Sequence, residues 1–456
     1  MDHLAGLLHR AADEAARFRS GLADRPVAAA DSVAAVAERL GGPLPDGPTP
    51  ADLVVDRLVA AADGGLVATA GSRYFGFVIG GALPAATAAD VLAAGWDQCA
   101  FSDALSPAAL AAEEVAGGWL KDLLGLPAGA SVGFVSGAQE ANTVGLAAAR
   151  HHVLAGAGWD VEARGLIGAP AVRVVAGGER HATVDRSLRL LGFGTAATED
   201  VAVDANGALD AGHLARVLAG GPPAPTIVCL QAGNVNTGAC DPLRPAIEAA
   251  RSHGAWVHVD GAFGLWAAAA PSTRHLVDGI ELADSWGCDG HKWLNVPYDS
   301  GFVFCADPAT HTAAASLTAA YLVGSAAAAA SQLVLASSRR ARGFAVWAAL
   351  QELGRSGVAD LVERCCALAR RFAAGVAAGG AEIANDVVLN QVLAGFGDDA
   401  RTDAVIAAVQ QDGTCWLGGT TWRGRRYIRV SVSNWSTTDD DVDRSVAAVL
   451  AAAARV

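Results

Sequence analysis

Lysine is nearly absent from this chain. Lys121 and Lys292 are the only two, so the other 31 of its 33 basic side chains (33 − 2) are arginines. Arginine keeps its proton, whereas a partly desolvated lysine can lose its proton and attack a carbonyl. Lys121 precedes Asp122 and fits a surface ion pair. Lys292 follows His291 in an apolar neighbourhood, which makes it a candidate Schiff-base lysine, with a structural ion pair as the alternative.

Positive charge is scarce as well. The formal net charge is −14, and no cluster of basic residues interrupts the acidic balance. A protein that follows a phosphate backbone needs such a cluster, so we expect no nucleic-acid partner.

Paired cysteine motifs are missing. The eight cysteines show neither CxxC spacing nor neighbouring histidines, which argues against a disulfide framework and against a metal site. We expect reduced core residues in a cytoplasmic protein. They are Cys99, Cys229, Cys240, Cys288, Cys305, Cys365, Cys366 and Cys415.

Long stretches of large apolar residues are also missing. The start, Met1-Asp2-His3, lacks the cationic and apolar regions of a signal peptide. Residues 312–338 carry no charge but consist mainly of small side chains, so a buried helix or loop is expected there rather than a membrane span.

Short apolar runs alternate with alanine-rich helical stretches from about residue 85 to 310. The runs at 132–135, 172–175, 227–230 and 256–259 are each followed by a turn. This alternation predicts an α/β fold with a mostly parallel sheet that helices cover on both faces. Ligands of such folds gather where strands end and helices begin.

The regions on either side of this alternation differ from it. Residues 1–84 read as helices joined by a Pro/Gly linker, with too little apolar content for a core of their own. Residues 341–456 read as a helix containing Trp347, a long helix over 358–378, then strands and a final helix. We therefore predict an N-terminal helical arm (1–84), a large α/β domain (85–340) and a small α+β domain (341–456).

Four strand ends carry polar or small residues. Ser136-Gly137-Ala138-Gln139 suits a phosphate held by backbone N–H groups, with an ordinary tight turn as the alternative. Neither a P-loop nor a complete GxGxxG motif is present. His181 and Asn234 follow the next two strands, where a satisfied histidine and a polar turn are the alternatives.

The fourth strand end carries Asp260. An aspartate that ends an apolar strand is costly unless it is paired with a cation. Period-two alternation puts His258 on the same face, which leaves a structural pair open. Further metal ligands at suitable spacing are missing, so a protonated heterocycle nitrogen is the better partner.

In this order, and ending at His291-Lys292-Trp293, these stretches resemble the group II pyridoxal-phosphate-dependent amino acid decarboxylases, which include the aromatic amino acid and glutamate decarboxylases. The resemblance covers about residues 73–436. It implies a fold-type I enzyme with a seven-stranded large-domain sheet and a homodimer with shared active sites. It also implies pyridoxal 5'-phosphate as cofactor.

The resemblance assigns roles to the strand-end residues. Lys292 matches the Schiff-base lysine, and Asp260 matches the carboxylate that keeps the pyridine nitrogen protonated. His181 and Ala262 match the residues on the two faces of the ring. The remaining cofactor contacts that it implies are Gly137, Ala138, Gln139, Asn234 and His291.

The resemblance also implies substrate contacts. Tyr321 matches the tyrosine of the catalytic loop that returns a proton after CO₂ loss, which favours simple decarboxylation over aldehyde formation. Arg429 matches the arginine that binds the substrate carboxylate in the glutamate-specific branch, with a structural arginine as the alternative. Val78, Ile79 and Phe101 match the side-chain pocket of the aromatic decarboxylases.

These matches predict an L-amino acid α-decarboxylase. The apolar pocket residues favour an aromatic or other hydrophobic substrate, while Arg429 keeps an acidic substrate open. Transamination or aldehyde synthesis on the same scaffold, and a non-catalytic binding protein that kept the fold, are the other hypotheses.

Overall fold

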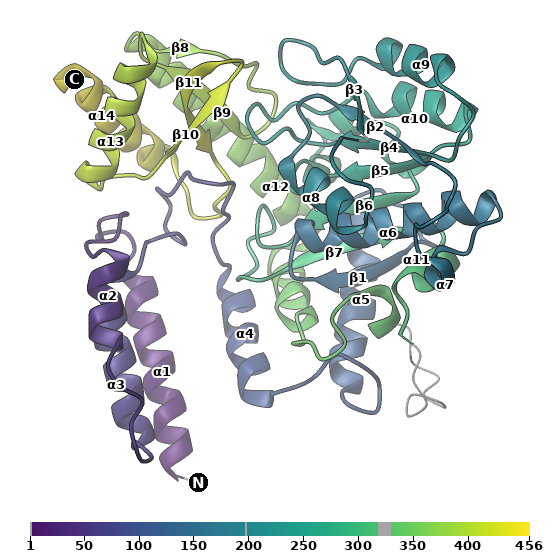
Figure 1. The fold of residues 1–456 in the computed structure, drawn as a ribbon. Coiled ribbons are helices and arrows are strands. Elements are labelled where there is room, and N and C mark those ends of the chain that lie inside the picture. Colours follow the sequence, from purple (N-terminus) through teal and green to yellow (C-terminus); the bar gives the residue numbers. More distant parts are fainter. Residues whose placement is uncertain (1, 197, 318–329) are drawn as a thin grey trace.

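Two β-sheets organise the chain in a computed structural model, which describes residues 2–196, 198–317 and 330–456. Figure 1 shows the larger sheet on one side, the smaller sheet beside it, and the N-terminal helices standing below the smaller one. The larger sheet has seven strands and the smaller has four.

The larger sheet has the order β1-β7-β6-β5-β4-β2-β3, and only β7 runs antiparallel to its neighbours. The predicted mostly parallel, seven-stranded sheet is therefore confirmed. Strands that are buried on both faces read as continuous apolar runs, which is why the sequence revealed four of them. The strands are β1 (Ser131–Val135), β2 (Arg173–Gly177), β3 (Thr198–Val201), β4 (Thr226–Gln231), β5 (Trp256–Asp260), β6 (Ser285–Asp289) and β7 (Gly301–Cys305).

Helices cover this sheet and connect its strands. Helix α6 (Ala138–Gly156) begins directly after β1 and packs across β5, β6 and β7. The other α-helices of this region are α4 (Pro84–Trp96), α5 (Pro107–Leu123), α7 (Val161–Arg164), α8 (Ala182–Leu190), α9 (Ala211–Gly220), α10 (Leu243–Ser252) and α11 (Pro308–Ala315). Helices α4 and α5 start with proline at the first position, where its missing N–H costs nothing.

The alanine-rich stretch after β5 differs from the expected α-helix. It forms the 3₁₀ helix η2 (Gly264–Ala269), all six residues of which are buried. An amphipathic α-helix needs a solvent face, which this segment lacks. The other 3₁₀ helices within the described residues are η1 (Asp63–Gly65), η3 (Arg274–Val277), η4 (Ile280–Leu282) and η6 (Ser331–Leu333).

The smaller sheet is antiparallel, with the order β10-β11-β9-β8. Its strands are β8 (Glu382–Ile383), β9 (Gln391–Gly395), β10 (Gly418–Trp422) and β11 (Arg425–Ser431), and its helices are α13 (Asp399–Asp412) and α14 (Asp439–Arg455). Helix α12 (Gly343–Ala378) contacts α4 and α5 as well as β9 and α14, so it connects the two sheets. Gly354 interrupts it with φ +60°, which separates the two helices that the sequence predicted.

The N-terminal helices α1 (Asp2–Ser20), α2 (Val33–Leu40) and α3 (Ala51–Ala62) run side by side, purple in Figure 1. Both α1 and α2 pack on α3. None of the described helices combines the length and the apolar character that crossing a membrane requires.

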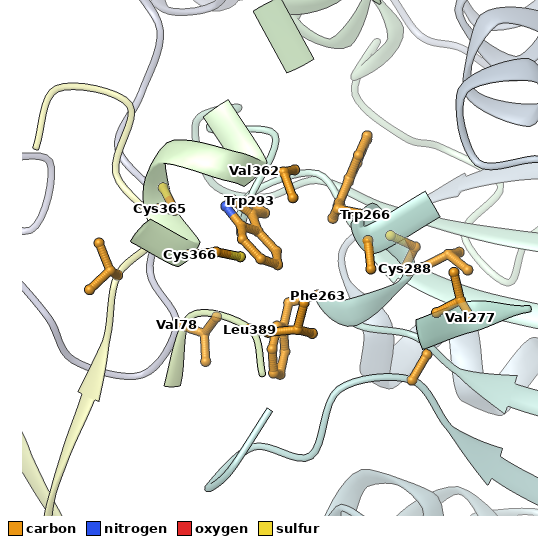
Figure 2. Close-up of a cluster of buried hydrophobic side chains, with 14 of the residues drawn as sticks. Val78, Phe263, Trp266, Val277, Cys288, Trp293, Val362, Cys365, Cys366 and Leu389 are labelled. Atoms are coloured by element: carbon orange, nitrogen blue, oxygen red, sulfur yellow. The ribbon is translucent and has the colours of Figure 1, made fainter. Parts of the chain in front are cut away.

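One hydrophobic cluster extends from the larger sheet to α12. Figure 2 shows Trp293 beside Cys366 of α12, with Phe263 beneath it. Trp293 and Phe263 are 1% and 2% exposed. The residue that follows Lys292 is thus fixed in the core, which anchors the lysine.

Candidate active site

A cavity of about 280 Å³ opens at the carboxyl ends of β1, β2, β4, β5 and β6. Parallel strands bring their ends to one edge of a sheet, so residues more than 150 positions apart meet here. The cavity is lined by Ser136, Gly137, Ala138, Gln139, His181, Thr183, Gln231, Gly233, Val235, Asp260, Ala262, Phe263, Asp289, His291 and Lys292.

Lys292 reaches this cavity from the turn after β6. Its Nζ lies 3.0 Å from Asp289 Oδ2 and 6.0 Å from the centroid of the Phe263 ring. The backbone of Gly80 packs against the backbone of Lys292, since a Cβ at Gly80 would lie 1.9 Å from the Lys292 carbonyl oxygen. The backbone is therefore held from behind while the amine faces the cavity.

Asp289 connects the lysine to the turn after β1. Its Oδ1 accepts a hydrogen bond from Ala138 N at 2.5 Å and lies 3.5 Å from His291 Nε2. The Asp289 side chain is only 3% exposed. One buried carboxylate thus holds the first N–H of α6, the histidine and the lysine in fixed relation.

The turn itself needs glycine because of close packing. A Cβ at Gly137 would lie 3.0 Å from His291 Cε1 and 3.2 Å from Asp289 Oδ1. The Gln139 side chain turns toward α8, where its Nε2 donates to Ser187 Oγ at 2.9 Å and to the Thr183 carbonyl at 3.3 Å. Any contact of Gln139 with an anion would therefore use its backbone N–H.

Asp260 ends β5 and is 4% exposed. Its Oδ1 accepts from Ala262 N at 3.2 Å, and among the described residues no cation forms an ion pair with it. A buried carboxylate with one backbone donor needs a further positive partner, so the cavity in front of Asp260 fits a cationic group.

His181 caps α8 and lines the same cavity as Asp260. Its Nδ1 lies 2.8 Å from Thr183 Oγ1 and accepts from Thr183 N at 3.3 Å. Burial lowers the pKa of His181, and Lys292 and Arg429 lower it further, while Asp260 and Asp289 act in the opposite direction.

His291 directly precedes Lys292 in the chain and also lines the cavity. Its Nδ1 accepts a hydrogen bond from Ser300 N at 3.1 Å, and its ring stacks on Tyr298 with the centroids 4.4 Å apart. Burial is the main cause that lowers the pKa of His291. The ring is therefore fixed in orientation, with Nε2 directed to Asp289.

Several predicted residues lie outside the cavity wall. The polar atoms of the Asn234 side chain bind other parts of the protein. Its Nδ2 donates to Glu179 O, after β2, and to Gln231 Oε1, and its Oδ1 accepts from Asn236 N. Gln231 and Gly233 line the cavity in its place.

The predicted side-chain pocket is not formed around this cavity in the single chain. Val78 is fully buried in the core near Phe263, Ile79 packs near Tyr74, and Phe101 does not line the cavity. Tyr321 falls outside the described residues.

Arg429 lies on β11 of the smaller sheet. It does not line the cavity, but it is close enough to lower the pKa of His181. Burial lowers the pKa of Arg429 itself, and no carboxylate of the described residues forms an ion pair with it.

The sequence reasoning missed some cavity residues. Asp289 was not predicted as a site residue. It ends a buried strand as Asp260 does, so the argument that a buried carboxylate needs a cationic partner applies to it as well. Phe263 and Thr183 carry no sequence signal of their own, because their place at the cavity depends on how η2 and α8 pack.

Comparisons with known proteins give the family of this chain. Residues 67–393 match the sequence profile described as the pyridoxal-dependent decarboxylase conserved domain. The chain belongs to the pyridoxal-dependent decarboxylase family. It is thus a pyridoxal-phosphate-dependent enzyme, as the sequence predicted.

Individual relatives support the family. The L-2,4-diaminobutyrate decarboxylase of Rhizobium meliloti (strain 1021) is 31% identical over 386 residues, which cover 80% of this chain and 74% of the relative. Tryptophan decarboxylase 1 of Oryza sativa subsp. japonica is 27% identical over 81% of this chain and 76% of its own. A crystal structure of Oryza sativa TDC with PLP and tryptamine superimposes with a TM-score of 0.91 at 23% identity, over 100% of this chain and 98% of that one.

The cavity of this decarboxylase fits the cofactor of its family. The buried Asp260 lacks a cationic partner within the described residues, and a protonated ring nitrogen supplies one. The glycine turn at the start of α6 allows a phosphate to approach backbone N–H groups, and Lys292 provides an amine for an aldehyde.

Proposed function

We propose that this decarboxylase removes the α-carboxylate of an L-amino acid with an aromatic or other hydrophobic side chain, releasing CO₂ and an amine. The observation that carries the proposal is the meeting of Lys292, Asp260 and His181 around one cavity. The names of the tryptophan decarboxylase and of the tyrosine/DOPA decarboxylases of Papaver somniferum favour an aromatic substrate.

Pyridoxal phosphate, when bound, supplies an aldehyde for amines and a ring that withdraws electrons from the carbon that loses CO₂. In this proposal the Lys292 amine would hold the cofactor through its aldehyde. Asp260 holds the proton on the ring nitrogen. Gly137, Ala138, the Gln139 backbone and His291 would hold the phosphate of the cofactor, and Ala262 and His181 would hold its ring.

Tyr321 is proposed to return a proton to the substrate carbon after CO₂ has left. The proposal rests on its position in the sequence, because the residue lies outside the described part of the chain. A phenylacetaldehyde synthase of Arabidopsis thaliana, 26% identical over 80% of this chain, makes aldehyde formation the product to distinguish.

An acidic substrate is the second candidate, and Arg429 favours it. This half-buried guanidinium forms no ion pair within the described residues, and it affects His181 at the cavity. A cation in that state suits a carboxylate, either the α-carboxylate of any substrate or the side chain of an acidic one.

We also propose a cytoplasmic homodimer with shared active sites, built from an arm (1–84), a large domain (85–340) and a small domain (341–456). Leu4, Leu8, Leu53, Val54 and Leu58 leave apolar side chains exposed on α1 and α3, which suits an arm that packs on a second copy. A partner would also supply the side-chain pocket, because Val78, Ile79 and Phe101 do not line the cavity in the single chain.

The test is a screen of the twenty amino acids for CO₂ release by the purified enzyme, followed by product analysis. The proposal expects the highest kcat/KM for an aromatic amino acid and one amine per CO₂. A maximum at glutamate or aspartate that is lost in Arg429→Met supports the second candidate. An aldehyde or keto acid as the main product contradicts simple decarboxylation.

A further inference from the structure

A chain of hydrogen bonds runs from inside the larger sheet to His181. It starts where β5 and β6 pair, because His258 and Ser285 are direct partners in the register. Trp256 Nε1 donates to Ser285 Oγ at 3.0 Å, and Ser285 Oγ lies 2.9 Å from His258 Nδ1. All three side chains are buried.

The chain continues through α6 to α8. His258 Nε2 lies 3.0 Å from Asn142 Oδ1, and Asn142 Nδ2 donates to Thr183 Oγ1 at 3.2 Å. Thr183 Oγ1 in turn lies 2.8 Å from His181 Nδ1. The fully buried Asn142 therefore connects a histidine inside the sheet to the histidine at the cavity.

Two glycines make room for this chain. A Cβ at Gly145 would lie 2.7 Å from His258 Cε1, and a Cβ at Gly287 would lie 2.6 Å from Asn142 Oδ1. Neither glycine has a positive φ, so the backbone conformation does not require glycine at these positions. Glycine is needed because a Cβ would collide with His258 or Asn142.

The direction of the hydrogen bonds is fixed at both ends by groups that can only donate. The indole N–H of Trp256 donates to Ser285 Oγ, and among the described residues the only acceptor left for the Ser285 hydroxyl proton is His258 Nδ1. At the other end, the backbone N–H of Thr183 points to His181 Nδ1 at 3.3 Å, so this nitrogen must accept.

The intermediate groups agree with this direction. His258 accepts at Nδ1 and therefore carries its proton on Nε2, which donates to Asn142 Oδ1. Burial lowers the pKa of His258 to about 4, so the ring is neutral and has one proton to place. The Asn142 amide then donates to Thr183, whose hydroxyl proton is left for His181 Nδ1.

We propose that this series of hydrogen bonds holds His181 as the neutral tautomer with its proton on Nε2. Thr183 and Asn142 are then positioning residues for His181. No described residue is hydrogen-bonded to Nε2, which leaves that N–H available to the cavity. The inference rests on the proposed function, in which His181 bounds the cofactor ring. His181 then donates to an anionic oxygen and does not act as a base.

The charges around His181 come from three strands. Asp260 on β5 and Asp289 on β6 raise its pKa, whereas Lys292 after β6 and Arg429 on β11 lower it. Burial lowers it most. Hydrogen bonds donated to Nδ1 stabilise the neutral ring, so the loss of the Thr183 hydroxyl should raise the pKa of His181.

The test is ¹⁵N-histidine NMR of the full-length holoenzyme, with His181 assigned by its loss in His181→Asn. Wild type should show the proton on Nε2. In Thr183→Val the pKa of His181 should rise by about one pH unit, and the acid limb of kcat/KM should move up with it. Thr183→Ser keeps a hydroxyl and should retain the wild-type pKa. Thr143→Val removes a nearby hydroxyl that is not part of these hydrogen bonds, and it should leave the pKa of His181 unchanged.

Asn142→Asp tests the direction itself. A carboxylate at this position accepts where the amide donated, so the Thr183 hydroxyl should turn toward it and the pKa of His181 should rise. A proton on Nδ1 in wild type, or an unchanged pKa in Thr183→Val, would overturn the inference. Because the tautomer is read without turnover, failure to release CO₂ would count against the proposed function and leave this inference standing.

Discussion

Asp260 shows most clearly how one residue ties the fold to the chemistry. Its position at the end of β5 leaves Asp260 only 4% exposed, and its carboxylate accepts one hydrogen bond, from a backbone N–H. Its proposed partner is the ring nitrogen of the cofactor, and the electron-withdrawing ring depends on that proton.

Asp260→Asn keeps the shape and removes the charge. We expect kcat to fall roughly 100-fold, since a preorganised charge of this kind is worth that much in other sites. Asp284→Asn is a matched control, because Asp284 likewise takes one backbone N–H, from Val257, before β6 begins. The comparison is made by steady-state kinetics, and equal losses in both variants would show that Asp260 acts only on the fold.

At this scale the sequence predicted the residues that end strands. Asp260, His181, Gly137 and Lys292 all line the cavity, because a strand end fixes where its next side chain goes. Asn234 shows the limit of this prediction. An amide in a turn can bind either a ligand or the backbone, and only the structure shows that Asn234 accepts from the backbone N–H of Asn236.

His311 is the residue through which α11 is attached to the edge of the larger sheet. Its Nδ1 lies 2.8 Å from Ser131 Oγ of β1, and its Nε2 lies 3.0 Å from the Leu333 carbonyl of η6. Burial lowers the pKa of His311 to about 4.

This pKa predicts a pH dependence of stability. The unfolded chain binds the proton first as the pH falls, so the contribution of His311 is complete above about pH 6.5 and is lost as the pH falls toward 4. Wild type should lose up to about 3 kcal/mol more than His311→Gln between pH 7 and 4. Urea denaturation of both proteins at each pH measures this, and parallel pH profiles would refute it.

Helix α5 and the segment before α12 are joined by a buried ion pair. Arg339 donates to both carboxylate oxygens of Glu113, at 2.5 and 2.7 Å, and both side chains are nearly inaccessible. Burial raises the pKa of Glu113, which Arg339 partly offsets.

Glu113→Ala leaves the Arg339 charge buried and unpaired. We expect a loss of about 3–5 kcal/mol in the free energy of unfolding. The double variant Glu113→Leu with Arg339→Met should recover most of that loss, because it removes both charges. A single variant as stable as wild type would show that the pair contributes little.

At the scale of elements the sequence predicted what periodicity determines. Continuous apolar runs identified β1, β2, β4 and β5, and the two parts of α12 were found on either side of Gly354. Helix α13 was missed, although Asp398 caps it, because its apolar residues are few and weakly periodic.

At the scale of the whole molecule, the N-terminal helices leave large apolar side chains exposed. Leu4 and Leu8 of α1 are 62% and 52% exposed. In the proposed homodimer a second copy covers this arm. The sequence indicates such an arm through the low apolar content of the first 84 residues, and the resemblance to the decarboxylases implies the homodimer.

Replacing Leu4 and Leu8 together by Asp should weaken the dimer. We expect the dissociation constant to rise about tenfold or more, since charges at an apolar contact are costly. Ile167→Asp is the control, because Ile167 is 95% exposed and lies outside the arm. Sedimentation velocity over a dilution series measures the mass, and a monomeric wild type would contradict the dimer.

The central claim is that Lys292 is the amine through which this decarboxylase holds its cofactor. Its test is Lys292→Ala beside Lys121→Ala, which removes the only other lysine, a surface residue that donates to Ala128 O and Ala130 O. After dialysis, wild type and Lys121→Ala should keep the visible absorption of bound cofactor and release CO₂ from the preferred amino acid. Lys292→Ala should lose that absorption, and its CO₂ release should fall at least about 1,000-fold. CO₂ release by Lys292→Ala at the wild-type rate would contradict the account.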